Sequence, residues 1–270
     1  MPTTIFGIII GIAMLIYAII TVTRQDPGAV ITLTGMYLNY PAFLIVFGGT
    51  MASTLIAHPM SHLVRGFEAF FAVFVRKDFA WLELIDDICA FSQTNTQKGM
   101  AGIEARLSMY RKPTLLRDGL TMIVNGYKLE EVEQFLNISV ERRYDLEQID
   151  SQVFRTMGRV APAFGFLGTV VGLIYMLRVM GETPERIGPF LAMALVSTFY
   201  GLILAHMIFN PMGNKLQHQA ELNYRIGRME MDGVRYIVKK MHPLYIKDQL
   251  SGYLPPRQRA VLMRETPGSV

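Results

Sequence analysis

The sequence predicts an all-α membrane protein with four transmembrane helices, a helical cytoplasmic domain between the second and third of them, and a helical cytoplasmic C-terminal tail. Three observations predict this fold class. Of the 270 residues, 51% are apolar and only 18% are charged, and the mean hydropathy is +0.29, which is too apolar for an ordinary soluble domain. Long apolar blocks alternate with charged ones, and the basic residues fall almost entirely on one side of the predicted topology.

Four apolar stretches are long enough to cross a bilayer, because a helix rises about 1.5 Å per residue and needs about 20 residues to span the hydrocarbon core. They cover residues 5–22, 38–57, 160–177 and 187–211, and none contains Asp, Glu, Lys or Arg. Buried helices of a large soluble protein are the alternative, but such helices are usually shorter and amphipathic. We therefore expect four spans.

The basic residues predict the orientation. Of the 26 Lys and Arg, only Arg24 lies between the first two stretches, and only Arg178 and Arg186 lie between the last two. Because bases in short loops resist transfer across the membrane, we expect both termini and the long central segment to face the cytoplasm. This topology already accounts for the net charge of +4, so we expect no nucleic-acid binding.

The predicted organisation has four parts: 1–57 with the first two spans, 58–159 as the cytoplasmic helical domain, 160–211 with the last two spans, and 212–270 as the cytoplasmic C-terminal segment. Apolar residues at three- and four-residue spacing predict further helices. These cover residues 81–91, 100–110, 114–125, 129–156 and 214–241. We expect the helix at 129–156 to run into the third span and the fourth span to run into 214–241.

Nothing in the sequence indicates an enzyme, a cofactor or a metal site. The stretch from Gly165 to Gly172 lacks the Gly-Lys-Ser/Thr ending of a phosphate loop and lies inside a span. His58 and His62 are spaced for one helix face, but no carboxylate or third ligand joins them. The single cysteine, Cys89, has no nearby histidine to activate it.

The spans carry hydroxyl groups but no acid. Thr169 lies in the third stretch, and Ser197 and Thr198 lie in the fourth. Such hydroxyls either line an ion pathway or simply bond to a carbonyl one turn back in their own helix, and the sequence leaves both explanations open. Pro162 and Pro211, near the cytoplasmic ends of these spans, remove helix hydrogen bonds and are expected to act as kinks or boundaries.

These spans carry a family resemblance. The segments at residues 159–172, 192–201 and 209–211 resemble the MotA/TolQ/ExbB family of ion-driven motor subunits. Within that family the four predicted spans, the Gly48-Gly49-Thr50 triplet and the late segment at residues 253–257 resemble the flagellar stator subunits MotA and PomA more than the three-span TolQ and ExbB.

The resemblance implies a stator subunit in the bacterial cytoplasmic (inner) membrane. Five copies would surround two copies of a MotB-like partner, which has one membrane helix with an Asp and a peptidoglycan-binding domain. That Asp would supply the acid that the spans of this chain lack. H⁺ or Na⁺ would be transported without any cofactor, and the ring would turn against the rotor protein FliG.

The resemblance also implies roles for individual residues. Pro162 and Pro211 match positions of conformational coupling, and Thr198 is expected beside the partner's acid. Thr169 and Ser197 match polar ion-pathway positions of sodium-type stators, but Ser197 stands where a Thr is usual, so the coupling ion stays open between H⁺ and Na⁺.

A rotor interface is implied in the cytoplasmic domain. Glu104 matches the family's Glu, whereas Thr96 stands where an Arg is expected, so Lys98 or Arg106 would substitute. A solvated surface without a partner is the alternative for each of these charges. For the whole chain, the alternatives are a non-flagellar ion-driven motor subunit of the TolQ/ExbB type and a membrane scaffold that conducts no ions.

Overall fold

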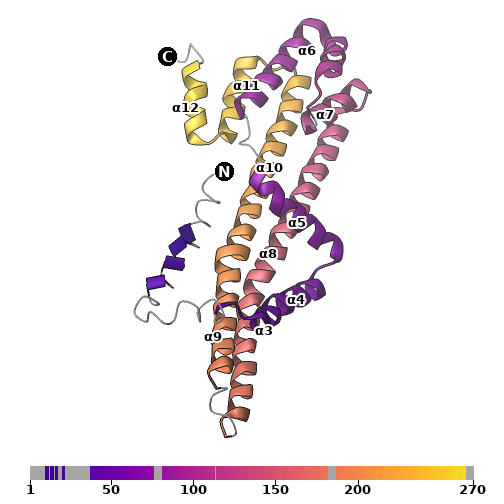
Figure 1. Ribbon diagram of the computed structural model, residues 1–270. Helices are drawn as coiled ribbons and strands as arrows, with labels where there is room; N and C mark the ends of the chain where they lie inside the picture. The colour runs from indigo at the N-terminus through magenta and orange to yellow at the C-terminus, as the bar shows by residue number, and fades with distance from the viewer. Residues whose placement is uncertain are drawn as a thin grey trace. The chain divides into compact units, whose positions relative to one another are not determined.

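The computed structural model describes residues 10–11, 13–14, 16–17, 20–21, 37–75, 81–112, 114–181 and 187–265. Every regular element in these ranges is a helix, which confirms the all-α class (Figure 1). Three helices are long and apolar enough to cross a membrane: Tyr40–Ala57, Leu129–Val179 and Ile187–Val238. Most of the first predicted span, 5–22, lies outside the described residues, so four crossings stay a prediction.

Two long helical runs carry the third and fourth spans. Helix α8 extends over Leu129–Val179. Helix α9 (Ile187–Ile203), the π-helical segment η3 (Leu204–Phe209) and helix α10 (Asn210–Val238) follow one another without a gap. Both predicted continuations beyond the spans are therefore confirmed.

The chain divides into two compact units: Met1–Lys77 with Glu147–His218, and Asp78–Leu146 with Gln219–Val270. We call them the first and the second unit. The predicted domain boundaries after residues 57, 159 and 211 refer to the membrane rather than to packing, and they stay a prediction.

In the first unit, the second predicted span consists of α3 (Tyr40–Phe43), η1 (Leu44–Gly48) and α4 (Gly49–Ala57), and α5 (Met60–Val75) follows it. Its successive neighbours on α8 have falling residue numbers, so it runs antiparallel to α8: Ile45 lies by Gly168, Gly49 by Phe164, and His58 by Thr156.

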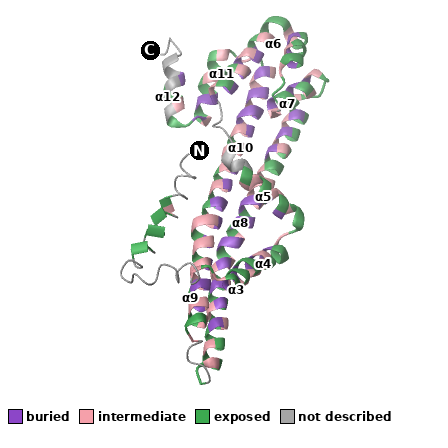
Figure 2. Ribbon diagram, viewed as in Figure 1, coloured by how far each residue is buried: buried purple, intermediate pink, exposed green. Residues whose placement is uncertain are grey.

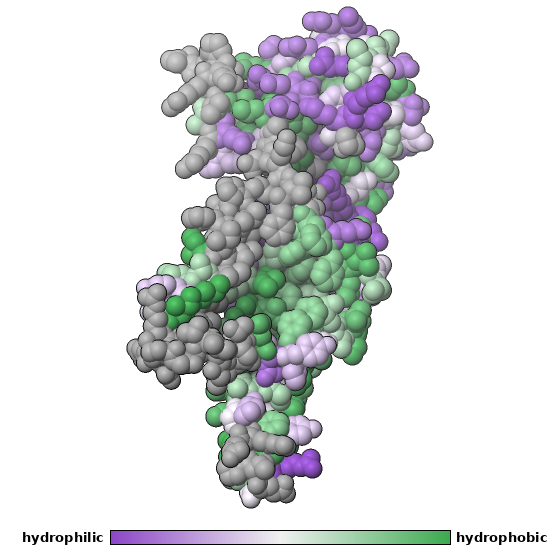
Figure 3. Space-filling model, in the orientation of Figure 1, coloured by the Kyte–Doolittle hydropathy of each residue, from purple (hydrophilic) through white to green (hydrophobic). Residues whose placement is uncertain are grey.

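The first unit has a small apolar core and an apolar exterior. Leu63 of α5, Val153 and Phe154 of α8, and Phe209 and Met212 of the fourth helical run pack together. Many large apolar side chains outside this core are exposed, among them Ile56 at 88%, Phe166 at 68% and Leu195 at 62% (Figure 2). Hydrophobic residues also dominate the visible surface of this unit in Figure 3. For such a surface, contact with lipid or with other subunits is favourable, whereas contact with water is unfavourable.

The second unit contains α6 (Trp81–Met109), α7 (Leu115–Val124), α11 (Pro243–Leu250), η4 (Ser251–Tyr253) and α12 (Pro256–Glu265), together with the first part of α8 and the last part of α10. Its core is aliphatic and aromatic, with Ile85, Phe91, Leu120 and Val234 almost fully buried. Figure 3 shows hydrophilic residues over α6 and α7.

Helix α6 is broken at Gly99, whose φ of 64° and ψ of −156° are not helical. A positive φ is easily adopted only by glycine, so the break is encoded at that residue. Two separate helices were predicted here, at 81–91 and 100–110. The break confirms the separation, but the end of the first helix at residue 91 was wrong, because the helix continues to Lys98.

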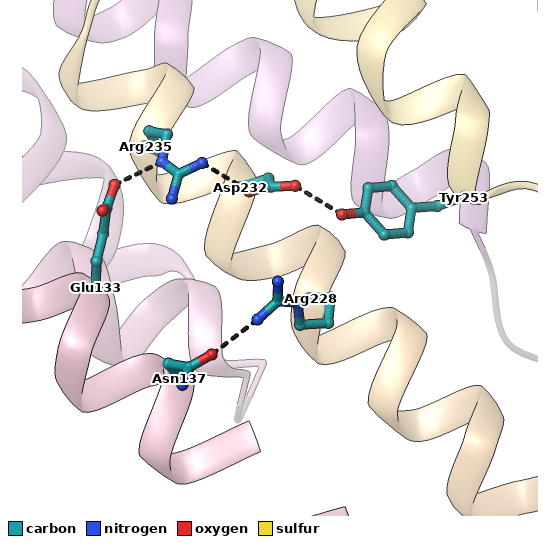
Figure 4. A network of polar contacts seen from close by, with 6 residues as sticks. All are labelled: Glu133, Asn137, Arg228, Asp232, Arg235 and Tyr253. Carbon is teal, nitrogen blue, oxygen red and sulfur yellow. Dashed lines mark hydrogen bonds and ion pairs between the residues drawn. The ribbon is translucent and has the colours of Figure 1, made fainter. Parts of the chain in front are cut away.

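A polar network joins α8, α10 and η4 in the second unit (Figure 4); its members are Glu133, Asn137, Arg228, Asp232, Arg235 and Tyr253. Arg235 Nε donates to Glu133 Oε1 at 2.6 Å, and its Nη1 donates to Asp232 at 3.3 Å. The Tyr253 hydroxyl donates to the other Asp232 oxygen at 2.6 Å. The C-terminal segment is thereby tied to α10 through charged groups.

Candidate functional site

The three predicted pathway hydroxyls meet where α8 packs on α9. Thr169 Oγ1 and Thr198 Oγ1 lie 2.5 Å apart and hydrogen-bond to each other. Thr169 also lies 3.0 Å from the Ala194 carbonyl oxygen, as a donor to it. The Ser197 hydroxyl lies 2.7 Å from the Ala194 oxygen and 3.2 Å from the Gly165 oxygen. Hydroxyls from two spans thus share two backbone oxygens.

The three hydroxyls differ in access. Ser197 is fully buried, and its hydroxyl donates to a carbonyl one turn back, which is the ordinary structural arrangement. Thr169 and Thr198 are only partly buried. Of these three hydroxyls, the accessible pair is therefore Thr169 with Thr198, and oxygen atoms of this kind suit Na⁺ or a proton-carrying water chain.

Glycines allow this contact. A Cβ added at Gly168 would lie 2.6 Å from Ser197 Cβ, and one added at Gly172 would lie 2.8 Å from Ala194 Cβ. A Cβ at Gly201 would lie 2.8 Å from the Ala161 carbonyl oxygen. Without these glycines α8 and α9 could not come close enough for Thr169 to reach Thr198.

Sequence reasoning missed Tyr200, the polar side chain that links α9 to the second predicted span. Its hydroxyl donates to the Tyr37 carbonyl oxygen and accepts the Asn39 N–H at 3.2 Å. A tyrosine within an apolar span was the only available signal, because its partners lie more than 160 positions earlier in the chain.

The two prolines occupy different settings. Pro162 lies inside the continuous helix α8, where its Cα faces Gly201. Pro211 is exposed and directly follows the π-helical segment η3 and Asn210. Because proline has no N–H to donate, the preceding turn of the helix loses a hydrogen bond at this position.

The three predicted rotor residues lie in the second unit and differ from one another. Lys98 and Glu104 are exposed on either side of the break at Gly99. Neither forms an ion pair with another described residue. Arg106 is half-buried, with its guanidinium 5.1 Å from the centre of the Phe91 ring, so it packs within the unit.

Two buried carboxyl groups outside the spans also lacked a sequence signal. Burial raises the pKa of Glu230 to about 7, although its Oε2 accepts the Leu115 N–H at 3.0 Å and Arg143 favours the charged form. Burial likewise raises the pKa of Asp150 despite its 2.7 Å ion pair with Arg65. Glu230 lies on α10 in the second unit, and Asp150 lies on α8 in the first unit.

Comparison with known proteins gives a consistent result. The model of the MotA/TolQ/ExbB proton channel family matches residues 110–229. The chain is 30% identical to chemotaxis protein PomA of Vibrio alginolyticus over 97% of this chain and 98% of that protein. It is 28% identical to motility protein A of Aquifex aeolicus, over 91% of this chain and 93% of the other.

The fold is similar to that of a solved complex. The structure of the flagellar MotAB stator complex from Bacillus subtilis contains a chain that superposes with a TM-score of 0.76 and 26% identity, over 92% of this chain and 97% of that one.

Proposed function

The chain belongs to the MotA/TolQ/ExbB proton channel family, and on this premise we propose that it is the membrane subunit of a flagellar motor stator. With a MotB-like partner it couples the flow of H⁺ or Na⁺ across the cytoplasmic membrane to torque on the rotor. Its likeness to motility protein A, to PomA and to the MotAB stator complex supports this role. The ion is moved and not chemically changed, so no enzymatic step is involved.

The pair of hydroxyls at Thr169 and Thr198 is the observation that carries the proposal. It offers oxygen atoms to a passing ion, yet the apolar stretches 38–57, 160–177 and 187–211 contain no carboxylate. A charge at membrane depth is costly and needs a counter-charge, so the acid has to come from another chain. A single-span partner with a membrane Asp, placed beside Thr198, supplies it.

Ion entry and release drive the movement. One charge that crosses 100 mV releases about 2.3 kcal/mol. Protonation or Na⁺ binding at the partner's Asp alternately removes and restores its charge next to Thr169, Ser197 and Thr198. Pro162 and Pro211 weaken the helices on the cytoplasmic side of this site and pass its changes to α8 and α10.

The proposal extends to the wider assembly. Five copies surround two copies of the partner, whose peptidoglycan-binding domain anchors the complex. Both termini face the cytoplasm, where Glu104 with Lys98 or Arg106 contacts FliG. The exposed apolar exterior of the first unit supports packing against lipid and neighbouring copies.

Deletion of the gene for this chain tests the proposal. Cells without it should build flagella that do not rotate, and expression of the chain together with its partner should restore swimming. A deletion strain that swims normally but loses energised transport at the outer membrane would favour a subunit of the TolQ/ExbB type instead. Swimming that is abolished by removal of external Na⁺ would identify Na⁺ as the coupling ion.

A further inference from the structure

We propose that Tyr200 is a positioning residue for the ion pathway: its hydroxyl fixes the start of the second predicted span against α9 and so sets the register of that span beside Thr169 and Thr198. The inference rests on the proposed function and adds a residue outside the hydroxyl cluster.

One phenol group serves two backbone groups at the beginning of this span. The Tyr200 hydroxyl donates to the Tyr37 carbonyl oxygen and accepts the Asn39 N–H. Amides at a helix start have no partner within the helix, so they need one from another part of the chain or from solvent. The Asn39 side chain accepts the Ala42 N–H at 3.1 Å, so Tyr200 and Asn39 together complete the cap of α3.

Aromatic packing holds the phenol in this position. The Tyr200 ring meets Phe43 edge to face, with centroids 6.2 Å apart and planes at 83°. The neighbouring Phe199 ring meets Tyr37 in the same manner at 5.8 Å. Such edge-to-face pairs favour one geometry over others, so the start of the span is held on both sides of Asn39.

The span that Tyr200 anchors lies on the part of α8 that carries Thr169. A Cβ added at Gly168, the neighbour of Thr169, would lie 3.6 Å from Ile45 Cγ2. Further along, Gly49 lies so close to the Phe164 ring that a Cβ there would be 2.2 Å from it. The register of the span therefore decides which of its side chains pack beside Gly168, the residue next to Thr169 in α8.

Loss of the hydroxyl would release this register. Without it, the Tyr37 oxygen and the Asn39 N–H lose their partner on α9, and the span can shift along α8. The space beside Thr169 and Thr198, into which the ion and the partner's acid have to fit, would then change shape.

Tyr200→Phe tests the inference because it keeps the ring and removes only the hydroxyl. Tyr40→Phe is a matched control, since Tyr40 is 71% exposed and its hydroxyl has no partner in the part of the chain that the structure describes. We expect both variants to reach wild-type amounts in the membrane with the partner bound. The concentration of the coupling ion at half-maximal swimming speed should shift by at least about fivefold in Tyr200→Phe, the equivalent of one of the two neutral hydrogen bonds that are lost, and should not shift in Tyr40→Phe.

Hydrogen exchange of the purified subunit gives a readout independent of motility. Amides of residues 37–48 should exchange faster in Tyr200→Phe than in the wild type or in Tyr40→Phe. An unchanged half-saturating concentration would overturn the positioning role, even if fewer stators assemble. Unchanged exchange would show that the Tyr200 hydroxyl does not hold the start of the span, and it would overturn the inference. Failure of the wild-type chain and partner to drive motility would refute the proposed function. The exchange experiment would still decide whether the Tyr200 hydroxyl holds the start of the span.

Discussion

At the residue scale, the hydroxyl group of Thr198 is the feature that the proposed ion pathway depends on. Its Oγ1 bonds to Thr169 across the contact between the two spans. Among the residues that the structure describes, the Thr54 hydroxyl in the second span bonds only to the Thr50 carbonyl oxygen one turn back, at 2.7 Å. The two threonines therefore offer a matched pair for mutation.

Thr198→Val should strongly reduce swimming speed without reducing the amount of subunit in the membrane, because valine keeps the shape of the side chain and removes its oxygen. Thr198→Ser should retain most function, and Thr54→Val should have little effect. Swimming speeds and membrane immunoblots measure this. Normal swimming with Thr198→Val would return the residue to a purely structural role.

Glu230 predicts a pH dependence of stability. Its pKa is raised from 4.5 to about 7, so between these values the folded chain keeps a proton that the unfolded chain has lost. The contribution of Glu230 to the free energy of unfolding is therefore fully present below pH 4.5 and is lost as the pH rises through 7. The whole loss amounts to at most about 3 kcal/mol.

Glu230→Gln should remove this dependence. Thermal unfolding of the purified complex at pH 5.5 and 8 should show a smaller loss of stability with rising pH in the variant than in the wild type. Glu130→Gln, an exposed carboxyl on α8, serves as the control and should follow the wild type. A variant whose pH dependence equals that of the wild type would contradict the assignment.

At the scale of the elements, the contact between α8 and α9 depends on glycine. In Gly201→Ala the new methyl group would lie 2.8 Å from the Ala161 oxygen and 3.1 Å from Gly165 Cα, and neither backbone atom can turn aside. We expect a cost of about 1–3 kcal/mol and a loss of torque, because the helices have to separate. Gly188→Ala in the same helix meets nothing within 4 Å and should be tolerated. Thermal stability and swimming speed of the two variants check this, and equal behaviour would contradict it.

The proposed rotor contact lies on helix α6. Glu104 is exposed beyond the break at Gly99, so Glu104→Lys should impair torque at an unchanged amount of subunit, since an exposed charge steers and registers a partner more than it stabilises a fold. A charge reversal on the rotor protein that restores motility would show direct contact. Normal motility would show that Glu104 is not needed for this contact. Lys98 would then be tested before Arg106, because Arg106 already packs on Phe91.

At the scale of the whole molecule, the proposed function requires a partner that supplies an acid. The apolar stretches of this chain hold hydroxyls and no acid, so the purified subunit alone should conduct no ions in liposomes, and addition of the partner should permit flux. A fluorescent reporter of internal pH, or Na⁺ uptake, measures this. Conduction by the subunit alone would contradict both the missing acid and the proposed mechanism.

The sequence by itself determined the features that depend on local composition and period. Long apolar stretches without charged residues identified the described spans, and apolar residues at three- and four-residue spacing identified the helices that continue from them. Both patterns can be recognised because each lies within one continuous segment of the sequence. The family motifs lie on these same segments. The separation of the helices at 81–91 and 100–110 was also predicted, although the length of the first helix and the break at Gly99 were not.

Only the tertiary structure decided which polar side chains meet. Ser197 turns into the helix contact while its neighbour Thr198 reaches Thr169, and one residue changes the direction of a side chain on a helix by about 100°. Tyr200 and Glu230 acquire their partners from segments far away in the chain. These pairings depend on the rotation and register of helices against each other, which non-local packing sets and no single segment encodes.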